Sequence, residues 1–253
     1  MLDTVGIVQT CFETDRERAN ATRKLNGKTV LEWIVRRVTD CQQLDGVVVL
    51  TDDRTENQFV SDIIPADVPV FSSSRPDALS RFAAALEEFS ADSAVRVRTD
   101  YPFVDPMLLD RLITTAQSHP SCDYASYCLR DGRPAILSPV GVCGEWFRSS
   151  ALFRAARKAT DIVDRRNVTQ YLYTHPKKFN ICLISAPNQI DRDDVRLTVR
   201  IEEDWDNVQT ILDALGPDEL DWQRIADLLD HQPALRERMA VLNRENDESQ
   251  TPV

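Results

Sequence analysis

Charged side chains follow two apolar runs of the sequence, at points where a strand is expected to give way to a loop. The run TVGIVQT at residues 4–10 precedes CFETDRERAN at 11–20, and SAVRVRTD at 93–100 ends on Asp100. The carboxyl end of a parallel strand opens into the crevice where α/β folds bind ligands, and carboxylate oxygens suit Mg²⁺. Asp100 is therefore a candidate metal or substrate ligand. The alternative is a turn or N-cap residue ahead of Pro102.

The loop after the first run is rich in charge and contains no glycine between residues 11 and 20. Glycines in a phosphate loop let backbone N–H groups converge on an anion, so this loop must rely on side chains. Arg16, Arg18, Arg23 and Lys24 supply such cations. The alternative interpretation is a solvated surface loop that leads into a helix.

The elements that position these residues alternate between apolar runs and amphipathic stretches. Apolar runs predict strands at residues 4–10, 46–51, 68–71 and 93–100, and helical spacing follows at 30–41, 55–64, 76–89 and 105–117. Asp105 ahead of Pro106 is the expected N-cap of the last of these helices. Four strand and helix units in series imply a mostly parallel sheet with helices on both faces.

The second half of the chain is less regular. We expect strands at 122–129, 178–187 and 191–199, and helices at 147–160, 163–176, 202–215 and over about 219–242. These elements predict one domain over residues 1–242, with a first part at 4–120, a second at 121–215 and C-terminal helices at 216–242. The polar stretch 243–253 is predicted to be a disordered tail.

Composition excludes several classes of function. The formal charge of -11 argues against general attraction to nucleic acid or to an anionic membrane, and no apolar stretch reaches the ~20 residues needed to cross a bilayer. Six cysteines lie scattered without a C-x-x-C pair, which favours buried thiols over a metal cage or disulfides. We therefore expect a cytoplasmic protein.

Five separated segments together resemble one family. They are IVQT at 7–10, LNGKTVLEWIVRRV at 25–38, TDYPFVDP at 99–106, DRRNVTQYLYTHPKKF at 164–179 and LTVRIEEDWDNV at 197–208. The chain is similar to the cytidylyltransferases that activate acidic sugars, above all to the spore-coat polysaccharide synthesis type. The resemblance implies a three-layer αβα, Rossmann-like nucleotide-diphospho-sugar transferase fold with a mostly parallel central sheet. It also implies that residues 4–120 form the nucleotide-binding half and residues 121–215 the acceptor-sugar half.

The resemblance also assigns a nucleotide site. It implies that Gln9, Thr10, Thr14 and Arg16 contact CTP or another nucleotide, and that Asp100 holds Mg²⁺ against the phosphates. Arg16 and Asp100 are then the expected catalytic residues. The implied reaction joins CMP to an acidic or amino sugar, with release of pyrophosphate, for surface polysaccharide biosynthesis.

The acceptor site is implied in the same way. Glu145, in GVCGEWF at 141–147, is expected to contact sugar hydroxyls, and Arg165 and Arg200 are expected to bind the anionic group of a sugar acid or sugar phosphate. Members of the resembled family often form dimers, so a homodimer is expected as well. The alternative for Arg165 is an ordinary place on an exposed helix face.

Several residues depart from the pattern of the resembled family. Cys11 stands where an arginine is usual, Glu13 and Ala19 where glycines are usual, Asn20 where a lysine is usual, and Arg200 where a second metal-binding aspartate is usual. Glu13 is expected to turn to solvent or to pair with Arg16 or Arg18. These changes leave open a second hypothesis, a catalytically impaired relative that acts as a nucleotide- or sugar-phosphate-binding or regulatory protein.

Overall fold

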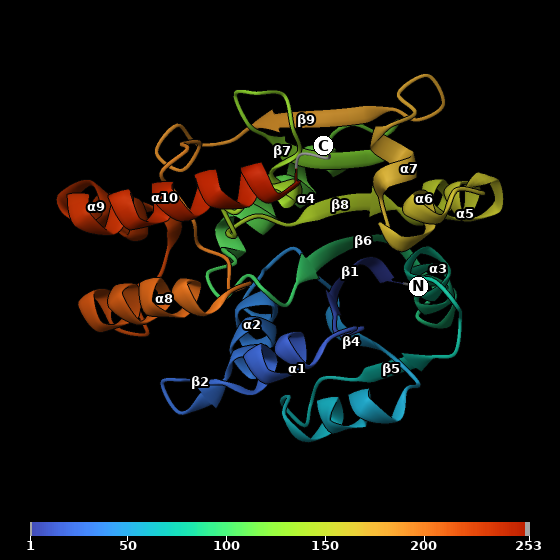
Figure 1. Ribbon diagram of the computed structural model, residues 1–253. Coiled ribbons are helices and arrows are strands. Elements are labelled where there is room, and N and C mark those ends of the chain that lie inside the picture. The colour runs from blue at the N-terminus through green and yellow to red at the C-terminus, as the bar shows by residue number, and fades with distance from the viewer. Residues whose placement is uncertain (1, 251–253) are drawn as a thin grey trace.

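A mixed sheet runs through the centre of the molecule. The computed structural model describes residues 2–250, except for the side chains of 246–250. Within that part, seven strands form one sheet in the order β5-β4-β1-β6-β8-β7-β9, and β8 is antiparallel to both of its neighbours while the remaining pairs are parallel (Figure 1). The strands are β1 (Leu2–Gln9), β4 (Gly46–Asp52), β5 (Val70–Ser73), β6 (Ala91–Arg98), β7 (Tyr124–Cys128), β8 (Glu145–Arg148) and β9 (Ile181–Ser185).

Helices cover both faces of this sheet. One face packs against α2 (Val30–Thr39), α4 (Pro106–Gln117), α8 (Glu202–Leu215), α9 (Trp222–His231) and α10 (Pro233–Gln250). The other face packs against α3 (Ala78–Glu88), α5 (Ser149–Lys158) and α7 (Gln170–Tyr173). The remaining elements are α1 (Asp15–Thr22), α6 (Ile162–Arg166), the 3₁₀ segments Thr55–Asp62 and Ala135–Leu137, and a hairpin of β2 (Lys24–Leu25) and β3 (Lys28–Thr29).

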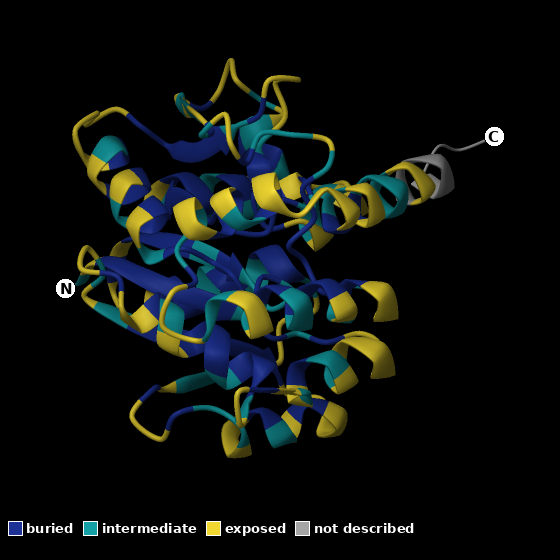
Figure 2. Cartoon of the chain, turned by 90° about the vertical axis from the view of Figure 1, so that its left-hand side faces the viewer, coloured by how far each residue is buried: buried dark blue, intermediate teal, exposed yellow. Residues whose placement is uncertain are grey.

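This layering confirms the predicted fold class, a Rossmann-like sheet between two layers of helices. The central strands are buried almost throughout, the edge strands β5 and β9 are only partly covered, and the outer faces of the helices are exposed (Figure 2). Runs such as GVVVLT in β4 are apolar without alternation because both faces of the strand are covered. No helix in the described part of the chain is both long and apolar enough to cross a membrane.

Several elements differ from the sequence prediction, which also lacked α1 and the hairpin of β2 and β3. Strand β8 was not predicted, and the helix expected at 163–176 divides into α6 and α7. Residues 191–199, predicted as a strand, are irregular because their backbone bonds to loops: Leu197 N donates to Pro139 O and Val199 N to Asp100 O. Helix α10 continues to Gln250, past the predicted end at 242, and residues 251–253 of the predicted tail lie outside the described residues.

Gly141 holds the irregular segment against the sheet. Its φ is +69°, and a Cβ at this position would lie 2.7 Å from the carbonyl carbon and oxygen of Leu197. Only glycine fits such a close approach at a positive φ without displacing backbone. The contact places Val199 and Arg200 beside the end of β6, where the candidate site lies.

Candidate functional site

A cleft of about 740 Å³ opens at the carboxyl ends of the parallel strands β1 and β6. This is the edge at which open α/β sheets bind ligands. The loop after β1, helix α1, helix α6 and the segment before α8 form its walls. Its lining residues are Gln9, Cys11, Phe12, Glu13, Thr14, Arg16, Glu17, Asn20, Arg96, Arg98, Thr99, Asp100, Val163, Arg166, Asn167, Val199 and Arg200.

Two arginines enclose Asp100. Arg98 donates Nε to Oδ1 at 2.8 Å and Nη2 to Oδ2 at 3.0 Å, and Arg200 donates Nε to Oδ2 at 2.8 Å. Burial alone would raise the pKa of the Asp100 carboxyl, but the two guanidinium groups outweigh it and hold that pKa well below its usual range. Asp100 is therefore an anion at every physiological pH, and both of its oxygens are already bonded.

Arg200 is held in place through its backbone. The Asp204 carboxylate accepts the backbone N–H of Arg200 at 2.8 Å and that of Ile201 at 3.2 Å. Asp204 is fully buried and pairs with the buried side chain of Arg196. The ion pair of Asp204 and Arg196 therefore fixes where the segment before α8 turns, and with it the direction from which Arg200 reaches Asp100.

The loop after β1 is tied down by hydrogen bonds to one carbonyl. Phe12 O accepts from Arg18 Nη1 at 3.2 Å, from Arg54 Nη2 at 2.8 Å and from Asn57 Nδ2 at 3.2 Å. Thr10 is buried, and both its N–H and its hydroxyl bond to Leu50 O. The expectation that Thr10 contacts nucleotide is therefore corrected, because its side chain connects β1 to β4 and does not line the cleft.

A capping box occupies the turn where a glycine-rich loop would bind phosphate. The Thr14 hydroxyl accepts from Glu17 N at 3.2 Å, and Glu17 Oε2 accepts from the backbone N–H groups of Glu13 at 2.8 Å and Thr14 at 2.9 Å. This is the reciprocal arrangement that begins many helices. The amides that face the cleft at the start of α1 are thus bonded to a carboxylate of the chain itself.

An ion pair crosses the cleft from α6 to this loop. Arg166 Nη2 lies 2.8 Å from Glu13 Oε2, and both side chains are more than half exposed. Glu13 was expected to pair with Arg16 or Arg18, so this partner is a correction. Arg16 lines the cleft and forms no ion pair with another described residue, which leaves its charge available to an anionic ligand.

Arg96 reaches the cleft from β6 with support from both of its neighbouring strands. Its Nε donates to Gln9 Oε1 at 2.8 Å, and its Nη1 lies 2.6 Å from Glu145 Oε1. Glu145 has 0% exposed area and also accepts the hydroxyls of Tyr124 and Thr169 at 2.8 Å. The expected contact of Glu145 with sugar hydroxyls is corrected: its carboxylate is sealed inside and positions Arg96.

Arg165 also lies outside the cleft. Its Nε donates to Asp77 Oδ2 at 2.9 Å, and its Nη1 donates to the carbonyls of Ala156 and Ala159 at the end of α5. All three contacts connect α6 to α5 and α3, so the expected role of Arg165 in substrate binding is corrected to a structural one. The neighbouring Arg166 is the α6 arginine that lines the cleft.

The thiol of Cys11 lies in the cleft wall. Burial raises its pKa to about 11, and nearby Arg81 only partly offsets this. The thiol therefore stays protonated at neutral pH and has little nucleophilic character. Cys41, Cys122 and Cys143 are buried as expected, and all six cysteines are free.

The residues of the cleft do not fit the Mg²⁺ site expected at Asp100. Mg²⁺ needs several oxygen ligands and a site that favours positive charge, whereas the two oxygens of Asp100 already accept three N–H groups from two arginines. In the described part of the chain, no cluster of three His, Cys, Asp or Glu residues has the spacing to hold a metal ion. The Asp100 carboxylate instead fixes the positions of Arg98 and Arg200.

Sequence reasoning missed three charged residues of the cleft, Arg96, Arg98 and Glu17, and each of them carries a readable signal. Arg96 and Arg98 alternate with valines in SAVRVRTD, so a period of two places both on one face of a strand. Glu17 follows Thr14 by three residues, which is the sequence signature of a capping box. Arg166, next to Arg165 in the segment DRRNVTQY, was expected near the pocket, and it does line the cleft.

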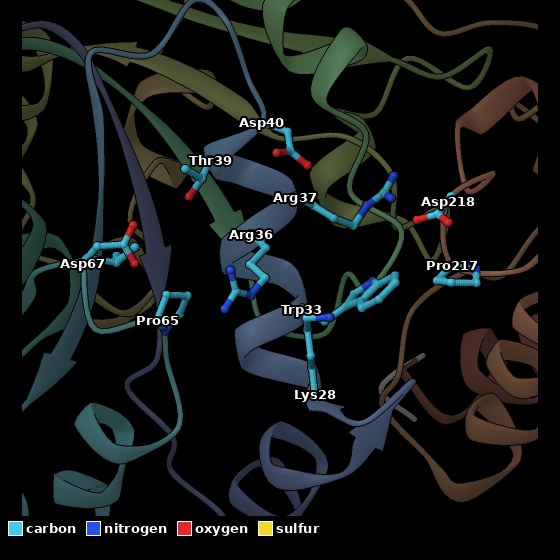
Figure 3. Close-up of a pocket in the computed structure, with 11 residues that line it drawn as sticks. Lys28, Trp33, Arg36, Arg37, Thr39, Asp40, Pro65, Asp67, Pro217 and Asp218 are labelled. Atoms are coloured by element: carbon cyan, nitrogen blue, oxygen red, sulfur yellow. The ribbon is translucent and has the colours of Figure 1, made fainter.

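The described part of the molecule has further hollows besides the cleft. Figure 3 shows one of them, a groove of about 330 Å³ beside α2 that is lined by Arg36 and Arg37. Arg36 pairs with Glu32, and Arg37 donates to the backbone carbonyls of Val104 and Leu220. This groove shares no lining residue with the cleft. A cavity of about 800 Å³ lies on the other side of Arg200, which lines both spaces.

The mixed sheet between two layers of helices, with a basic cleft at the carboxyl ends of β1 and β6, is the architecture of the Rossmann-like nucleotidyltransferases. Comparison with known proteins narrows this class. The chain belongs to the cytidylyltransferase family, a family of nucleotidyltransferase enzymes, whose family model matches residues 6–245.

Individual relatives agree with this assignment. The spore coat polysaccharide biosynthesis protein SpsF of Bacillus subtilis is 28% identical over 222 residues, which cover 85% of this chain and 89% of SpsF. The 3-deoxy-manno-octulosonate cytidylyltransferase of Leptospira interrogans is 27% identical over 121 residues, 47% of this chain and 49% of that protein. A cytidylyltransferase structure from Leptospira borgpetersenii superposes with a TM-score of 0.82 at 18% identity and covers 93% of this chain and 97% of that one.

Proposed function

We propose that this protein transfers CMP from CTP to an acidic or amino sugar, as a step in surface polysaccharide biosynthesis. The observation that carries the proposal is the charge of the cleft. In a chain of net charge -11, the described cleft lining gathers Arg16, Arg96, Arg98, Arg166 and Arg200 at the ligand-binding edge of the sheet. The names of two relatives, a spore coat polysaccharide protein and a sugar-acid cytidylyltransferase, support this choice of substrate.

The reaction needs positioning and charge stabilisation more than covalent chemistry. A sugar hydroxyl oxygen forms a bond to the α-phosphorus of CTP, the bond from that phosphorus to the β-phosphate oxygen breaks, and pyrophosphate leaves while the hydroxyl proton passes to solvent. Arginine N–H groups aimed at the phosphates would stabilise the charge that develops on them. Arg16 and Arg98 reach the cleft from opposite walls, α1 and β6.

Pyrophosphate release tests this function directly. We expect release from CTP, and much less from ATP, GTP or UTP, in the presence of a panel that includes 3-deoxy-manno-octulosonate and other sugar acids. Arg16→Ala should lower kcat/KM by roughly 10²-fold, as loss of a transition-state donor does. Arg157→Ala, which removes the same charge from an exposed position on α5, is the matched control and should leave the rate unchanged.

A second function is favoured by a specific observation, the bonded state of the anion-binding groups. The Glu17 carboxylate accepts hydrogen bonds from the backbone amides at the start of α1, and the Asp100 carboxylate forms ion pairs with two arginines of the cleft. A binding or regulatory protein that holds a nucleotide or sugar phosphate without turnover would give calorimetric binding and no pyrophosphate. The cytoplasmic location, the homodimer, and the absence of nucleic-acid and membrane partners stay predictions.

A further inference from the structure

The contacts of Asp100 leave little room for a divalent cation. Three N–H groups from Arg98 and Arg200 converge on its two oxygens within 3.0 Å. A cation bound to either oxygen would lie close to two positive charges, and Oδ2 already accepts two of the three N–H groups. A carboxylate compensated in this way acts as a counter-ion that positions arginines.

No other group in the cleft replaces it as a metal ligand. Among the described residues, the further acidic side chains of the lining are Glu13 and Glu17. Glu13 pairs with Arg166 at 2.8 Å, and Glu17 accepts two backbone N–H groups. Among the described residues that line the cleft, the positive charge available to a ligand therefore comes from arginine side chains.

The arginines on Asp100 retain unused donors. Within the described part of the chain, Arg200 Nη1 and Nη2 and Arg98 Nη1 have no hydrogen-bond partner. Two cations on one anion leave a local charge of +1, and a guanidinium fork matches two oxygens of a phosphate. The Asp204 carboxylate accepts the backbone N–H of Arg200, and this bond holds the Arg200 guanidinium group in position before a ligand binds.

We propose that this cleft binds the phosphates of its nucleotide without a divalent cation. Arg98 and Arg200 supply the counter-charge, and Asp100 is the positioning residue that aligns them. The inference rests on the proposed function, since it assumes that the cleft receives a nucleoside triphosphate. It assigns Arg200 the electrostatic role that a bound metal ion would have.

Calorimetric titration of the full chain with CTP, once in EDTA and once in Mg²⁺, tests the inference. We expect the two dissociation constants to agree within about threefold. Arg200→Asp should weaken CTP binding in EDTA by roughly 10- to 100-fold, because it removes a charge-assisted donor. In this variant Mg²⁺ should restore the affinity for CTP, since the ion can bind between Asp100 and the introduced carboxylate. Arg157→Asp makes the same charge change outside the cleft and should bind as the parent does.

The outcomes separate two kinds of failure. Binding of CTP by the parent chain only in Mg²⁺ overturns the cation-free inference and leaves the proposed function intact. No heat from any nucleotide in either buffer overturns the proposed function and the inference with it. Arg200→Gln, which keeps a planar N–H donor without the charge, serves as a second variant and should lose an intermediate amount of CTP affinity. Circular dichroism verifies that each variant is folded.

Discussion

Glu145 is the centre of a buried network that holds Arg96 at the wall of the cleft. Its carboxylate bonds to Arg96, Tyr124 and Thr169, and it has no exposed area. Removing one partner of a buried ion pair leaves the other charge uncompensated, at a cost of about 3–5 kcal/mol. We therefore expect Glu145→Ala to lower the free energy of unfolding by that amount, as measured by urea denaturation.

The matched control for this prediction is an exposed ion pair. Glu237 and Arg244 lie 3.3 Å apart with most of each side chain in solvent. Glu237→Ala should change the free energy of unfolding by less than about 1 kcal/mol, because water screens such pairs. Equal, small effects of the two substitutions would contradict a central role for Glu145.

At the residue scale, the sequence predicted which side chains line the cleft where a strand end dictated the position, while their contacts with a ligand stay predictions. Gln9 is the last residue of β1, and Asp100 follows the end of β6 by two residues, so both line the cleft. Glu145 and Arg165 did not behave as expected, because burial depends on partners far away in the sequence. Glu145 is sealed by side chains 21, 24 and 49 residues distant, and no local pattern encodes that enclosure.

At the scale of an element, the start of α1 competes with any anionic ligand. Glu17 accepts the two amides that a phosphate would otherwise take, and Thr14 accepts the N–H of Glu17. Glu17→Gln retains a capping-box side chain but removes its negative charge. We expect tighter CTP binding by this variant in calorimetry, since like-charge repulsion with the phosphates is lost.

Thr14→Ala provides the comparison for this element. It removes the N-cap and should cost about 1 kcal/mol of unfolding free energy without removing any charge from the cleft. A gain in CTP affinity from Thr14→Ala as large as that from Glu17→Gln would indicate that loop mobility, and not the charge of Glu17, limits binding.

The sequence predicted helices and strands correctly where hydrophobic periodicity and intrinsic propensity agreed. The strands β1, β4 and β6 and the N-cap Asp105, which accepts from Leu108 N at 3.0 Å, are confirmed. Residues 191–199 have strand-like composition, but Arg192 and Arg196 pair with Asp194 and Asp204 and draw the segment over the sheet edge. Together with the backbone bonds from Leu197 to Pro139 and from Val199 to Asp100, these ion pairs override local propensity.

For the whole molecule, ionisation limits stability at alkaline pH. Burial raises the pKa of the thiols of Cys41 and Cys122 to about 12, with the hydrogen bonds of Cys41 to the Asp110 carboxylate and of Cys122 with Cys182 as second causes, against 9.0 in the unfolded chain. These thiols stay neutral in the native state, so their contribution to stability is complete below pH 9 and is lost as the pH rises above it. Thermal unfolding should accordingly show a lower Tm at pH 10 than at pH 8, and Cys41→Ala should reduce that difference.

Acid should destabilise the protein through a different set of groups. Burial opposes ionisation of Asp52 and Asp194, but hydrogen bonds from Arg54, Asn57, Arg192 and Arg236 hold both pKa values below the ordinary 3.8. A lowered pKa stabilises the native state above pH 3.8, and this stabilisation is lost as the pH falls through the native pKa. The raised pKa of buried Asp105 acts in the opposite direction but is a single group.

Urea denaturation of the parent chain and of Asp52→Asn, from pH 7 to pH 3, tests whether the Asp52 carboxylate contributes to the loss of stability in acid. The parent should have a constant free energy of unfolding between about pH 5 and 7 and a falling one below about pH 4. Asp52→Asn should be less stable at pH 7, because Arg54 loses its counter-ion. The gap between the two proteins should close as the parent's Asp52 becomes protonated, and a gap that stays constant down to pH 3 would show that Asp52 contributes through packing and not through its charge.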